Sequence, residues 1–519
     1  MAPKTPRLDN YRKMLDRFYE PLVLLHVLVR KKPLGPHVMT KHNSTVPMAT
    51  QRRFLKNLAY ICDFHKGGKS TASIGLEERD DSFVFWLALN EDDGNRNTAS
   101  FLNSVLVRLK DLLNDPASDR PQQERDLLSY CINFASGRIK KEFSNLSSAV
   151  RNCRKKYLRA EVDQDLAEWL GQFENHGSTT PLDICKLACR SRDSNMMLQL
   201  NNSCRSSENI PTDATFMLCR ARHCIGRLGC HVQAVKELVS DGSHVTKFLD
   251  GFCVAKVPLP ECVAPPQADG HTNLRGIFRP MIQSHDSARW DKIEESLPNL
   301  DRLVPDDGLE GSIVGLFQEE KIHTRVHSEV QVLEHFYKNS LQFATNDRFI
   351  ATSKLACICC RLYFRHHPAR VAELDSHQKV YINWGPIHLP GGRDHPDFAS
   401  QRQLMGKITH DIREAALDRV FQLTPPWPFH HDSITEIASL EYETNSDLDS
   451  TSSTTLDGTT GRSTPDNTAE IMKEIVGAKF EVRNEPHEID QPDESSDEDG
   501  GVALEPPAVY KRSFRINGR

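Results

Sequence analysis

One stretch, residues 71–89, constrains the fold more than any other part of the chain. Residues 71–76 have the two-residue periodicity of a strand, which places Ile74 and Leu76 on one face. Residues 83–89 read Phe-Val-Phe-Trp-Leu-Ala-Leu. The charged residues 77–81 between these runs suit a turn, so the pattern predicts a β-hairpin. Its second strand is apolar on both faces, which is typical of a strand inside a covered sheet. We therefore expect a sheet buried between helices.

Helical spacing of apolar residues is found on both sides of this hairpin. Two helices are expected before it, over Tyr11–Val29 and Met48–Phe64. After Asn90–Gly94 the chain reads as helical for a long way, and Thr98 is expected to cap the first helix. Further helices are predicted at residues 122–134, 138–159, 163–173, 184–200 and 215–239, before a proline-containing loop or linker at 257–273.

From about Ile313 onward the pattern alternates between helix and strand. Helices are predicted at 326–343, 357–366 and 400–421, with strands at 348–353 and 379–384 between them. This α-β-α-β-α succession is typical of a sheet covered by helices. We predict an α/β fold with a mixed sheet covered by helices, together with a large helical region that is either N-terminal or inserted.

Acidic residues are concentrated near the C-terminal end. Residues 432–519 hold 20 acidic and 8 basic residues, a net charge of −12, whereas the whole chain carries −6. The rest of the chain is therefore mildly basic, which permits an anionic substrate. Because a composition rich in Ser, Thr, Asp and Glu buries too little apolar surface to offset the entropy of ordering, we predict a disordered acidic tail. A protein partner could bind through this tail.

The sequence shows no export signal and no membrane span. Residues 1–10 are polar, and the longest mostly apolar run, Pro21–Val29, is roughly half the length of a membrane span. With 38% apolar and 26% charged residues, we expect a soluble protein of the cytoplasm or nucleus, with no membrane partner. In such a reducing compartment the 14 cysteines serve as packing groups, metal ligands or nucleophiles.

Two clusters in the helical region each allow two interpretations. One is a set of cysteines and histidines that we expect to be buried packing residues. The alternative is that they form a zinc site, in addition to the one described below. The residues are Cys185, Cys189, Cys219, His223, Cys224, Cys230 and His231. The other is a basic helix, expected to form a solvated face, with nucleic-acid or phosphate binding as the alternative. Its basic residues are Arg138, Lys140, Lys141, Arg151, Arg154, Lys155, Lys156 and Arg159.

Two short motifs carry the chemistry. His327-Ser328-Glu329 opens one predicted helix, a strand follows, and Cys357-x-x-Cys360 opens the next. Cys357 and Cys360 are three residues apart, so on a first helical turn both sulfurs point the same way and can bind one ion. One histidine and two cysteines leave the fourth position of a tetrahedral zinc open for water, as a catalytic site requires. Glu329 can approach that water only at the N-terminal mouth of its helix.

The residues around this group bear on whether the zinc site is open or closed. Cys359 lies between the two ligand cysteines and points elsewhere on the helix, so it is expected to pack rather than bind metal. A closed structural site would need a fourth ligand nearby, and the candidates are Cys359, His366 and His367.

The pattern resembles the fingerprint of the cytidine deaminase-like superfamily, H-x-E followed by P-C-x-x-C. Residues 327–331 and 353–360 are more closely similar to a fungal branch related to bacterial toxin deaminases. The resemblance covers residues 326–384, with Ala356 where the fingerprint has proline. It implies that zinc is bound by His327, Cys357 and Cys360, and that Glu329 is the catalytic proton carrier.

The resemblance also implies substrate contacts and domain limits. The family's fold opens with a hairpin whose terminal asparagine often contacts substrate, here Asn90, and Ser353 stands where many members have Ser or Thr. If residues 69–96 are that hairpin, the helical residues 97–306 are an insertion; an independent domain is the alternative. The predicted units are 1–68 (N-terminal helices), 69–96 (hairpin), 97–306 (helical region), 307–425 (zinc domain) and 432–519 (tail).

The implied function is that of a zinc-dependent hydrolytic deaminase acting on a cytosine- or adenine-type base. Its substrate would be a nucleoside, a nucleotide or nucleic acid. One alternative is a catalytically inactive scaffold with structural zinc, and another is a nucleic-acid-binding protein that uses the basic helix. An intact Glu329 favours the enzyme, because a structural zinc site needs no carboxylate at that position.

Overall fold

The computed structural model describes one compact unit of the chain. The described residues are 9–29, 33–40, 45–94, 97–114, 119–160, 164–174, 179–205, 212–282, 286–303, 308–318, 322–345 and 347–422. The predicted acidic tail at 432–519 lies outside them. Within these ranges, no helix combines the length and the apolar character needed to cross a membrane.

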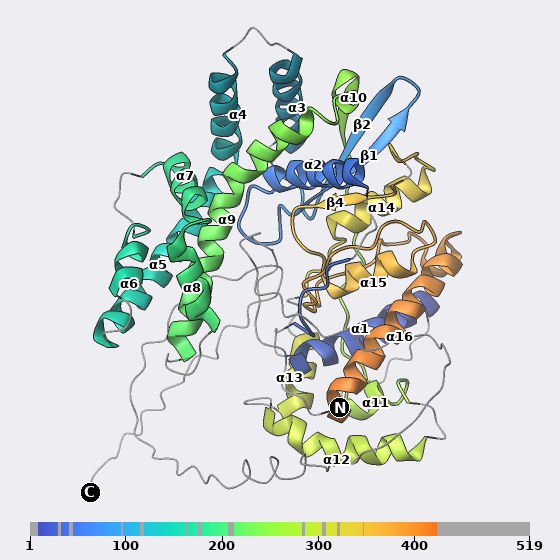
Figure 1. The fold of residues 1–519 in the computed structure, drawn as a ribbon. Helices are drawn as coiled ribbons and strands as arrows, with labels where there is room; N and C mark the ends of the chain where they lie inside the picture. Colours follow the sequence, from blue (N-terminus) through green and yellow to red (C-terminus); the bar gives the residue numbers. More distant parts are fainter. Residues whose placement is uncertain are drawn as a thin grey trace, which may run out of the picture. The chain divides into compact units, whose positions relative to one another are not determined.

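A four-stranded mixed sheet organises this unit, with strand order β3-β2-β1-β4 (Figure 1). The strands are β1 (Ala72–Arg79), β2 (Ser82–Leu89), β3 (Phe252–Lys256) and β4 (Ile350–Thr352). β1 and β2 form the predicted antiparallel hairpin, β4 pairs antiparallel with β1, and β3 pairs parallel with β2. β2 thus lies inside the sheet, and its residues enter the apolar cores on both sides, which explains why both of its faces are apolar.

Helices cover both faces of the sheet, as the sequence predicted. Alternate residues of β1 face opposite ways, so Ile74 packs in a core with α2 (Val46–Cys62), while Gly75 faces α14 (Ser328–Lys338). α14 lies so close that a Cβ atom at Gly75 would stand 2.6 Å from the Phe336 ring. A glycine is therefore required where this helix crosses the strand.

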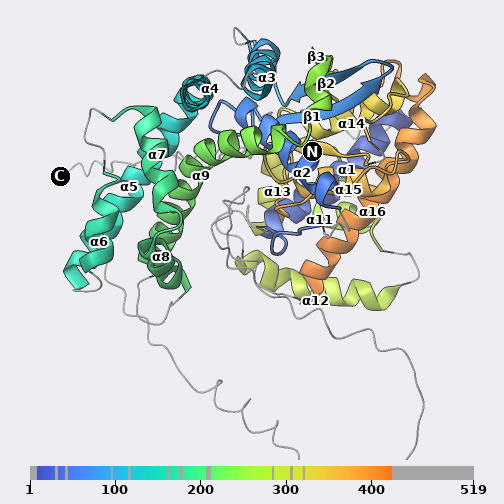
Figure 2. The same cartoon turned by 45° about the horizontal axis from the view of Figure 1, so that its top comes forward.

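The chain leaves the sheet after β2 and returns to it at β3. The residues between these neighbouring strands form the helices α3 (Thr98–Asn114), α4 (Arg120–Phe134), α5 (Ser136–Ala160), α6 (Gln164–Gly171), α7 (Pro181–Ser191), α8 (Asn195–Arg205), α9 (Thr212–Gly242) and α10 (Lys247–Asp250). The long α9 packs against α2, α5, α7 and α8 (Figure 1 and Figure 2). α9 therefore connects two cores. It shares the core beside the sheet with α2, and it shares a second core with α5, α7 and α8.

The remaining helices surround α14 and the segment that follows it. They are α1 (Asn10–Val29), α11 (Leu274–Phe278), α12 (Ser287–Leu303), α13 (Gly308–Gln318), α15 (Ile358–His366), the short 3₁₀ helix η1 (Gly392–Asp394) and α16 (Phe398–Gln422). α16 packs against α1, α12 and α15. These helices share one large apolar core with α14, and that core includes the three cysteines at 357, 359 and 360.

Several local predictions were wrong. Asn97, rather than Thr98, caps α3, because its Oδ1 accepts from the Ser100 amide at 3.0 Å. The predicted helix at 184–200 is two helices, since the chain turns between Ser191 and Asn195.

The predicted strand at 379–384 is also absent. Apart from an isolated bridge between Trp384 and Arg325, this segment pairs with no strand of the described residues. Its carbonyls are used otherwise: Lys379 O accepts from the Ile358 amide at the start of α15, and Val380 O contacts the His26 imidazole at 2.9 Å. The apolar pattern that resembled a strand reflects burial of an irregular segment in the core.

Candidate metal centre and active site

The two motifs meet at the N-terminal ends of two helices. His327 is the residue that precedes α14, and Cys357 is the residue that precedes α15. Cys357 also caps α15, because its sulfur accepts from the Cys360 amide at 3.5 Å. Both positions have extended backbone, which turns the side chains back toward the mouth of the helix. The pairing of β4 with β1 holds the strand that lies between the motifs in the sequence.

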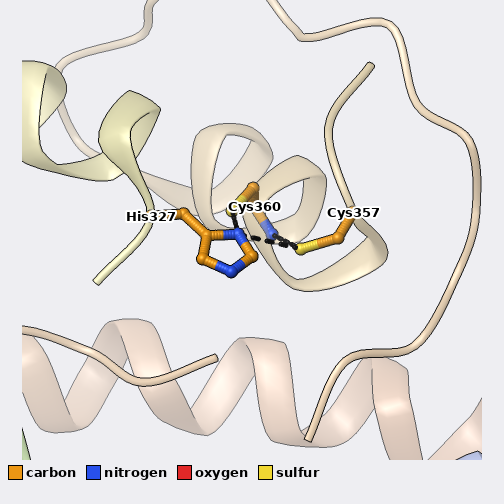
Figure 3. A group of neighbouring side chains, drawn as sticks. All are labelled: His327, Cys357 and Cys360. Atoms are coloured by element: carbon orange, nitrogen blue, oxygen red, sulfur yellow. Dashed lines mark hydrogen bonds between the residues drawn. The ribbon is translucent and has the colours of Figure 1, made fainter. Parts of the chain in front are cut away.

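Three side chains from these motifs point toward one another (Figure 3). The His327 Nδ1 atom lies 3.6 Å from Cys357 Sγ and 3.3 Å from Cys360 Sγ. The three donor atoms all lie within 4.8 Å of each other, and all three residues are buried. Within the described part of the chain, these residues form the one such group that could hold a metal ion.

The donor set fits zinc. Zinc binds cysteine sulfur at about 2.3 Å and histidine nitrogen at about 2.0 Å in tetrahedral geometry, which places neighbouring ligands roughly 3.6 Å apart. The observed separations of 3.3 and 3.6 Å are close to this spacing. Two soft sulfurs and an imidazole are also the ligands that favour zinc over magnesium or calcium.

The other candidate ligands lie outside the three-residue group. Cys359 is fully buried and is not part of the three-residue group. His366 Nε2 pairs with Asp411 at 2.7 Å, and His367 Nε2 pairs with Glu334 at 3.0 Å. Among the described residues, the group therefore has three protein ligands, as an open site requires.

A hydrogen bond orients one of the ligands. The Trp384 indole donates from Nε1 to Cys360 Sγ at 3.1 Å, and Trp384 is fully buried. The Tyr19 hydroxyl donates to the Trp384 carbonyl at 3.1 Å, which ties this position to α1. Donors of this kind fix the direction of a thiolate and stabilise its charge.

The charge balance favours one thiolate in the group. Burial alone would raise the Cys357 thiol pKa, but hydrogen bonds from Cys359 and Cys360 and the charge of His327 hold it well below its ordinary value. Burial raises the Cys360 pKa. Burial lowers the pKa of His327, but the adjacent Cys357 outweighs it, so the His327 pKa lies above its usual value. The group is arranged around negative charge on sulfur, which a cation would neutralise.

Glu329 lies on the first turn of α14, beside this group. It is 4% exposed, and burial raises its pKa although the charge of His327 opposes the rise. Ser328 approaches its Oε2 at 3.4 Å and shares a hydrogen bond of 2.8 Å with Ser73 of β1. A buried carboxyl with a raised pKa can both take up and release a proton near neutral pH.

Glu329 and His327 line a cavity of about 40 Å³ together with Cys357. The remaining polar wall is formed by Thr71, Asn90, Arg325, Lys354, His377, Tyr381 and Asn383. Asn90 and Arg325 also line a neighbouring cavity of about 250 Å³, and Lys354 also lines another of about 120 Å³. The small cavity therefore has larger spaces on two sides.

The structure places the two predicted substrate-contact residues differently. Asn90 lines the Glu329 cavity; its Nδ2 donates to the Gly68 carbonyl at 2.8 Å and its Oδ1 accepts from the Ser328 amide at 2.7 Å. Ser353 lines the 120 Å³ cavity instead, and its hydroxyl accepts from the Ala72 amide at 3.1 Å. Their substrate-binding roles stay predictions.

Sequence reasoning missed Asn383 and Trp384. Both belong to the segment expected to be a strand, and neither is part of a motif. The aromatic and amide character at 383–384 was the available signal, but only the three-dimensional arrangement brings them beside Cys360 and Glu329.

One residue of the basic helix departs from the expected solvated face, while four others lie on it. Arg138 was expected on a solvated basic face, yet it is 2% exposed and forms ion pairs with Asp63 at 3.0 Å and Glu142 at 3.1 Å. Lys140, Lys141, Arg151 and Lys155 are exposed on the same helix. The side chains of Lys156 and Arg159 lie outside the described residues.

Comparison with known proteins gives one family match. A family model described as "OTT_1508_deam:-like deaminase" matches residues 326–388, a small part of the 519-residue chain. This segment contains His327, Glu329, Cys357, Cys360 and Asn383, and it is similar to deaminases. No curated protein and no solved structure matches the chain.

Proposed function

We propose that this protein is a zinc-dependent hydrolytic deaminase that acts on a cytosine- or adenine-type base. The observation that carries the proposal is that the buried residues Glu329, His327 and Cys357 line one cavity, beside Cys360, within a segment similar to deaminases. The finer relation to a fungal branch and to bacterial toxin deaminases is part of this proposal. It is supported by the sequence of residues 327–331 and 353–360.

His327, Cys357 and Cys360 would hold the zinc ion. Zinc bound there would supply Lewis acidity, which makes a water molecule a nucleophile near neutral pH. Glu329 would accept the proton from that water while a C–O bond forms at the amino-bearing carbon. It would deliver the proton to the ring nitrogen and then assist the C–N bond to break, so that ammonia leaves and a carbonyl group remains.

The walls of the cavity favour a base as the group that enters. The 40 Å³ cavity holds roughly three water molecules' worth of space, so a sugar or phosphate must lie outside it. Glu329 is the only carboxylate among its described lining residues, whereas Lys354 and Arg325, which pairs with Glu91 at 2.8 Å, are cations. These features support a nucleoside, nucleotide or nucleic-acid substrate whose base alone reaches Glu329.

We also propose that the hairpin belongs to the same domain as the zinc motifs. The pairing of β1 with β4 supports this, because β4 lies between the two motifs. Residues 97–306 would then be an insertion between the hairpin and the zinc motifs. It includes the helices between β2 and β3, the strand β3, and the helices α11 and α12 that follow β3.

The first experiment tests the metal. Purified full-length protein should contain one zinc ion per chain, and Cys357→Ser and Cys360→Ser should each lose it. Cys359→Ser is the matched control and should keep the metal, because Cys359 is buried but outside the ligand group. Full zinc content in both ligand variants would refute the assignment.

The second experiment tests the reaction. Nucleosides, nucleotides and oligonucleotides bearing cytosine or adenine are screened for released ammonia, and the best substrate is used with Glu329→Gln. Loss of a general acid–base group costs about 10²–10⁴ in rate, and because Glu329 serves several steps we expect a loss at or above that range. Glu310→Gln, on the exposed side of α13, should change nothing.

Zinc content separates the two outcomes of this experiment. Glu329→Gln should retain zinc, since the amide keeps the size of the carboxyl group. Near-normal turnover by Glu329→Gln would refute the mechanism. If wild-type protein binds zinc but releases ammonia from no base, the alternative of an inactive scaffold with structural zinc replaces the deaminase.

A further inference from the structure

Asn383 lies in the wall of the Glu329 cavity, and part of its side chain makes no hydrogen bond. It is 5% exposed, and its amide oxygen is buried without a partner among the described residues. No other described side chain that lines this cavity has a buried nitrogen or oxygen in that condition. Buried polar atoms are nearly always paired, so an unpaired one at a candidate active site indicates a missing partner.

The backbone around Asn383 is held rigidly. Its carbonyl accepts from the Arg325 amide at 2.8 Å, and the Arg325 carbonyl accepts from the Gly385 amide at 2.9 Å. The next residue, Trp384, is fully buried and donates to Cys360 Sγ. The Asn383 backbone is therefore fixed in position relative to the proposed zinc ligands. A half-turn of the side-chain amide exchanges oxygen and nitrogen at almost unchanged shape, so it can present an acceptor or a donor.

The other amide of the cavity is not available in this way. Asn90 uses its Nδ2 on Gly68 and its Oδ1 on Ser328, so it connects the end of β2 to α14. Both amides are almost equally buried, at 5% and 8% exposure. Asn90 therefore has bonds that hold the cavity together, whereas Asn383 has capacity left for a molecule inside it.

We propose that Asn383 recognises the substrate by hydrogen-bonding the edge of the amino-bearing base on which Glu329 acts. The inference rests on the proposed deaminase function. An amide pairs well with a base edge, because the edge offers a donor and an acceptor side by side. Bases that share the reacting –N=C–NH₂ group differ at their other edge atoms, so Asn383 contributes to the choice between them.

Stability measurements separate recognition from a structural role without any substrate. Asn383→Ala removes no hydrogen bond of the described side chains, so its melting temperature and zinc content should match the wild type. Asn90→Ala is the matched control. It leaves the Ser328 amide without its Asn90 acceptor and removes one of two hydrogen bonds to the Gly68 carbonyl, so it should lower the melting temperature by at least about 2 °C. An equal fall in melting temperature in both variants would show that Asn383 has a structural role, and it would overturn the proposal.

Substrate measurements test recognition directly in the zinc-loaded full-length protein. Asn383→Ala should lower kcat/KM for the preferred base by roughly 10- to 100-fold, and should change the ratio between cytosine and adenine substrates. A change that is equal for all bases, or no change, would overturn the proposal.

Binding measurements distinguish failure of the Asn383 proposal from failure of the proposed deaminase function. Cytidine, adenosine and their monophosphates are titrated into wild-type and Asn383→Ala protein by calorimetry. If the wild type binds a nucleoside but releases no ammonia, the deaminase proposal fails, while roughly tenfold weaker binding by Asn383→Ala still supports recognition. Equal binding by both proteins overturns recognition alone, and no binding of any base by the wild type overturns both.

Discussion

Arg138 of α5 joins the helices between β2 and β3 to the segment that leads into the sheet. Its guanidinium forms ion pairs with Asp63 at 3.0 Å and Glu142 at 3.1 Å, and it also donates to the Asp63 carbonyl at 2.6 Å. Both acids are 2% exposed or less. Arg138→Met keeps most of the side-chain length and removes the charge, so two buried carboxylates lose their main cation.

The loss of folding stability expected for Arg138→Met follows from the burial of these charges. Breaking a buried ion pair by removing one partner costs about 3–5 kcal/mol. Burial alone would raise the Glu142 pKa, but Arg138, with Arg227 behind it, holds that pKa at about 2 against an ordinary 4.5. This difference corresponds to about 3 kcal/mol of folding free energy. Because the folded-state pKa is depressed, the contribution is complete above pH 4.5 and is lost as the pH falls toward 2.

The assay is urea unfolding at pH 7, with a matched substitution on the same helix as control. Arg154 of α5 pairs with Glu174 at 2.6 Å, but the two side chains are 31% and 26% exposed. Solvent screening limits such a pair to at most about 1 kcal/mol, so Arg154→Met should be nearly neutral. If Arg138→Met lost no more stability than Arg154→Met, the buried network would not stabilise the fold as argued here.

Two further predictions concern a buried histidine and the zinc environment. Burial and Arg138 hold the His231 pKa at about 3. Between pH 6.5 and about pH 3, His231 is therefore protonated in the unfolded chain but stays neutral in the folded protein. Stability should fall by about 1.4 kcal/mol per pH unit from this residue between those values, and His231→Phe should flatten that slope in urea unfolding at pH 7, 6 and 5. Trp384→Phe removes the donor to Cys360 Sγ and should weaken zinc binding by about 10- to 100-fold in chelator competition; an unchanged affinity would contradict the role of that bond.

Elements whose signal is local could be predicted from the sequence. α1, α2 and the β1–β2 hairpin follow from the spacing of apolar residues, and their structural bounds differ from the expected ones by a few residues. The two halves of the zinc motif were likewise expected at helix starts, and His327 and Cys357 lie there. In each case the residues that form the sequence pattern also form the contacts that hold the element in place.

Elements whose form depends on distant residues could not be predicted. β3 is a five-residue strand that pairs with β2 across more than 150 intervening residues, and its own sequence carries little strand signal. Residues 379–384 have a strand-like sequence but contact a histidine and a helix start instead of a strand. Arg138 looked like part of a solvated face because its partner Asp63 lies 75 residues away.

The same distinction applies to the candidate site. Asn90 could be predicted because it ends a recognisable hairpin, whereas Asn383 lies on no regular element and is 54 residues from Glu329. Ser353 was chosen by its distance from Cys357 in the sequence, yet its hydroxyl is directed to the strand pairing rather than to the Glu329 cavity. A position in a motif does not determine which cavity a side chain faces.

Ser353 also shows how the helices between β2 and β3 are connected to the candidate metal site. Asp63, held by Arg138, accepts from the Ser70 hydroxyl at 2.6 Å and from the Ser353 hydroxyl at 3.5 Å. Ser70 precedes β1, and Ser353 follows β4, so one carboxylate contacts the chain beside both strands at the place where they pair. Cys357 lies four residues beyond Ser353, and His327 is held against β1 and β2 through Ser328. The pairing of β1 with β4 therefore helps to bring the proposed zinc ligands together, and Arg138 on α5 supports that pairing through Asp63.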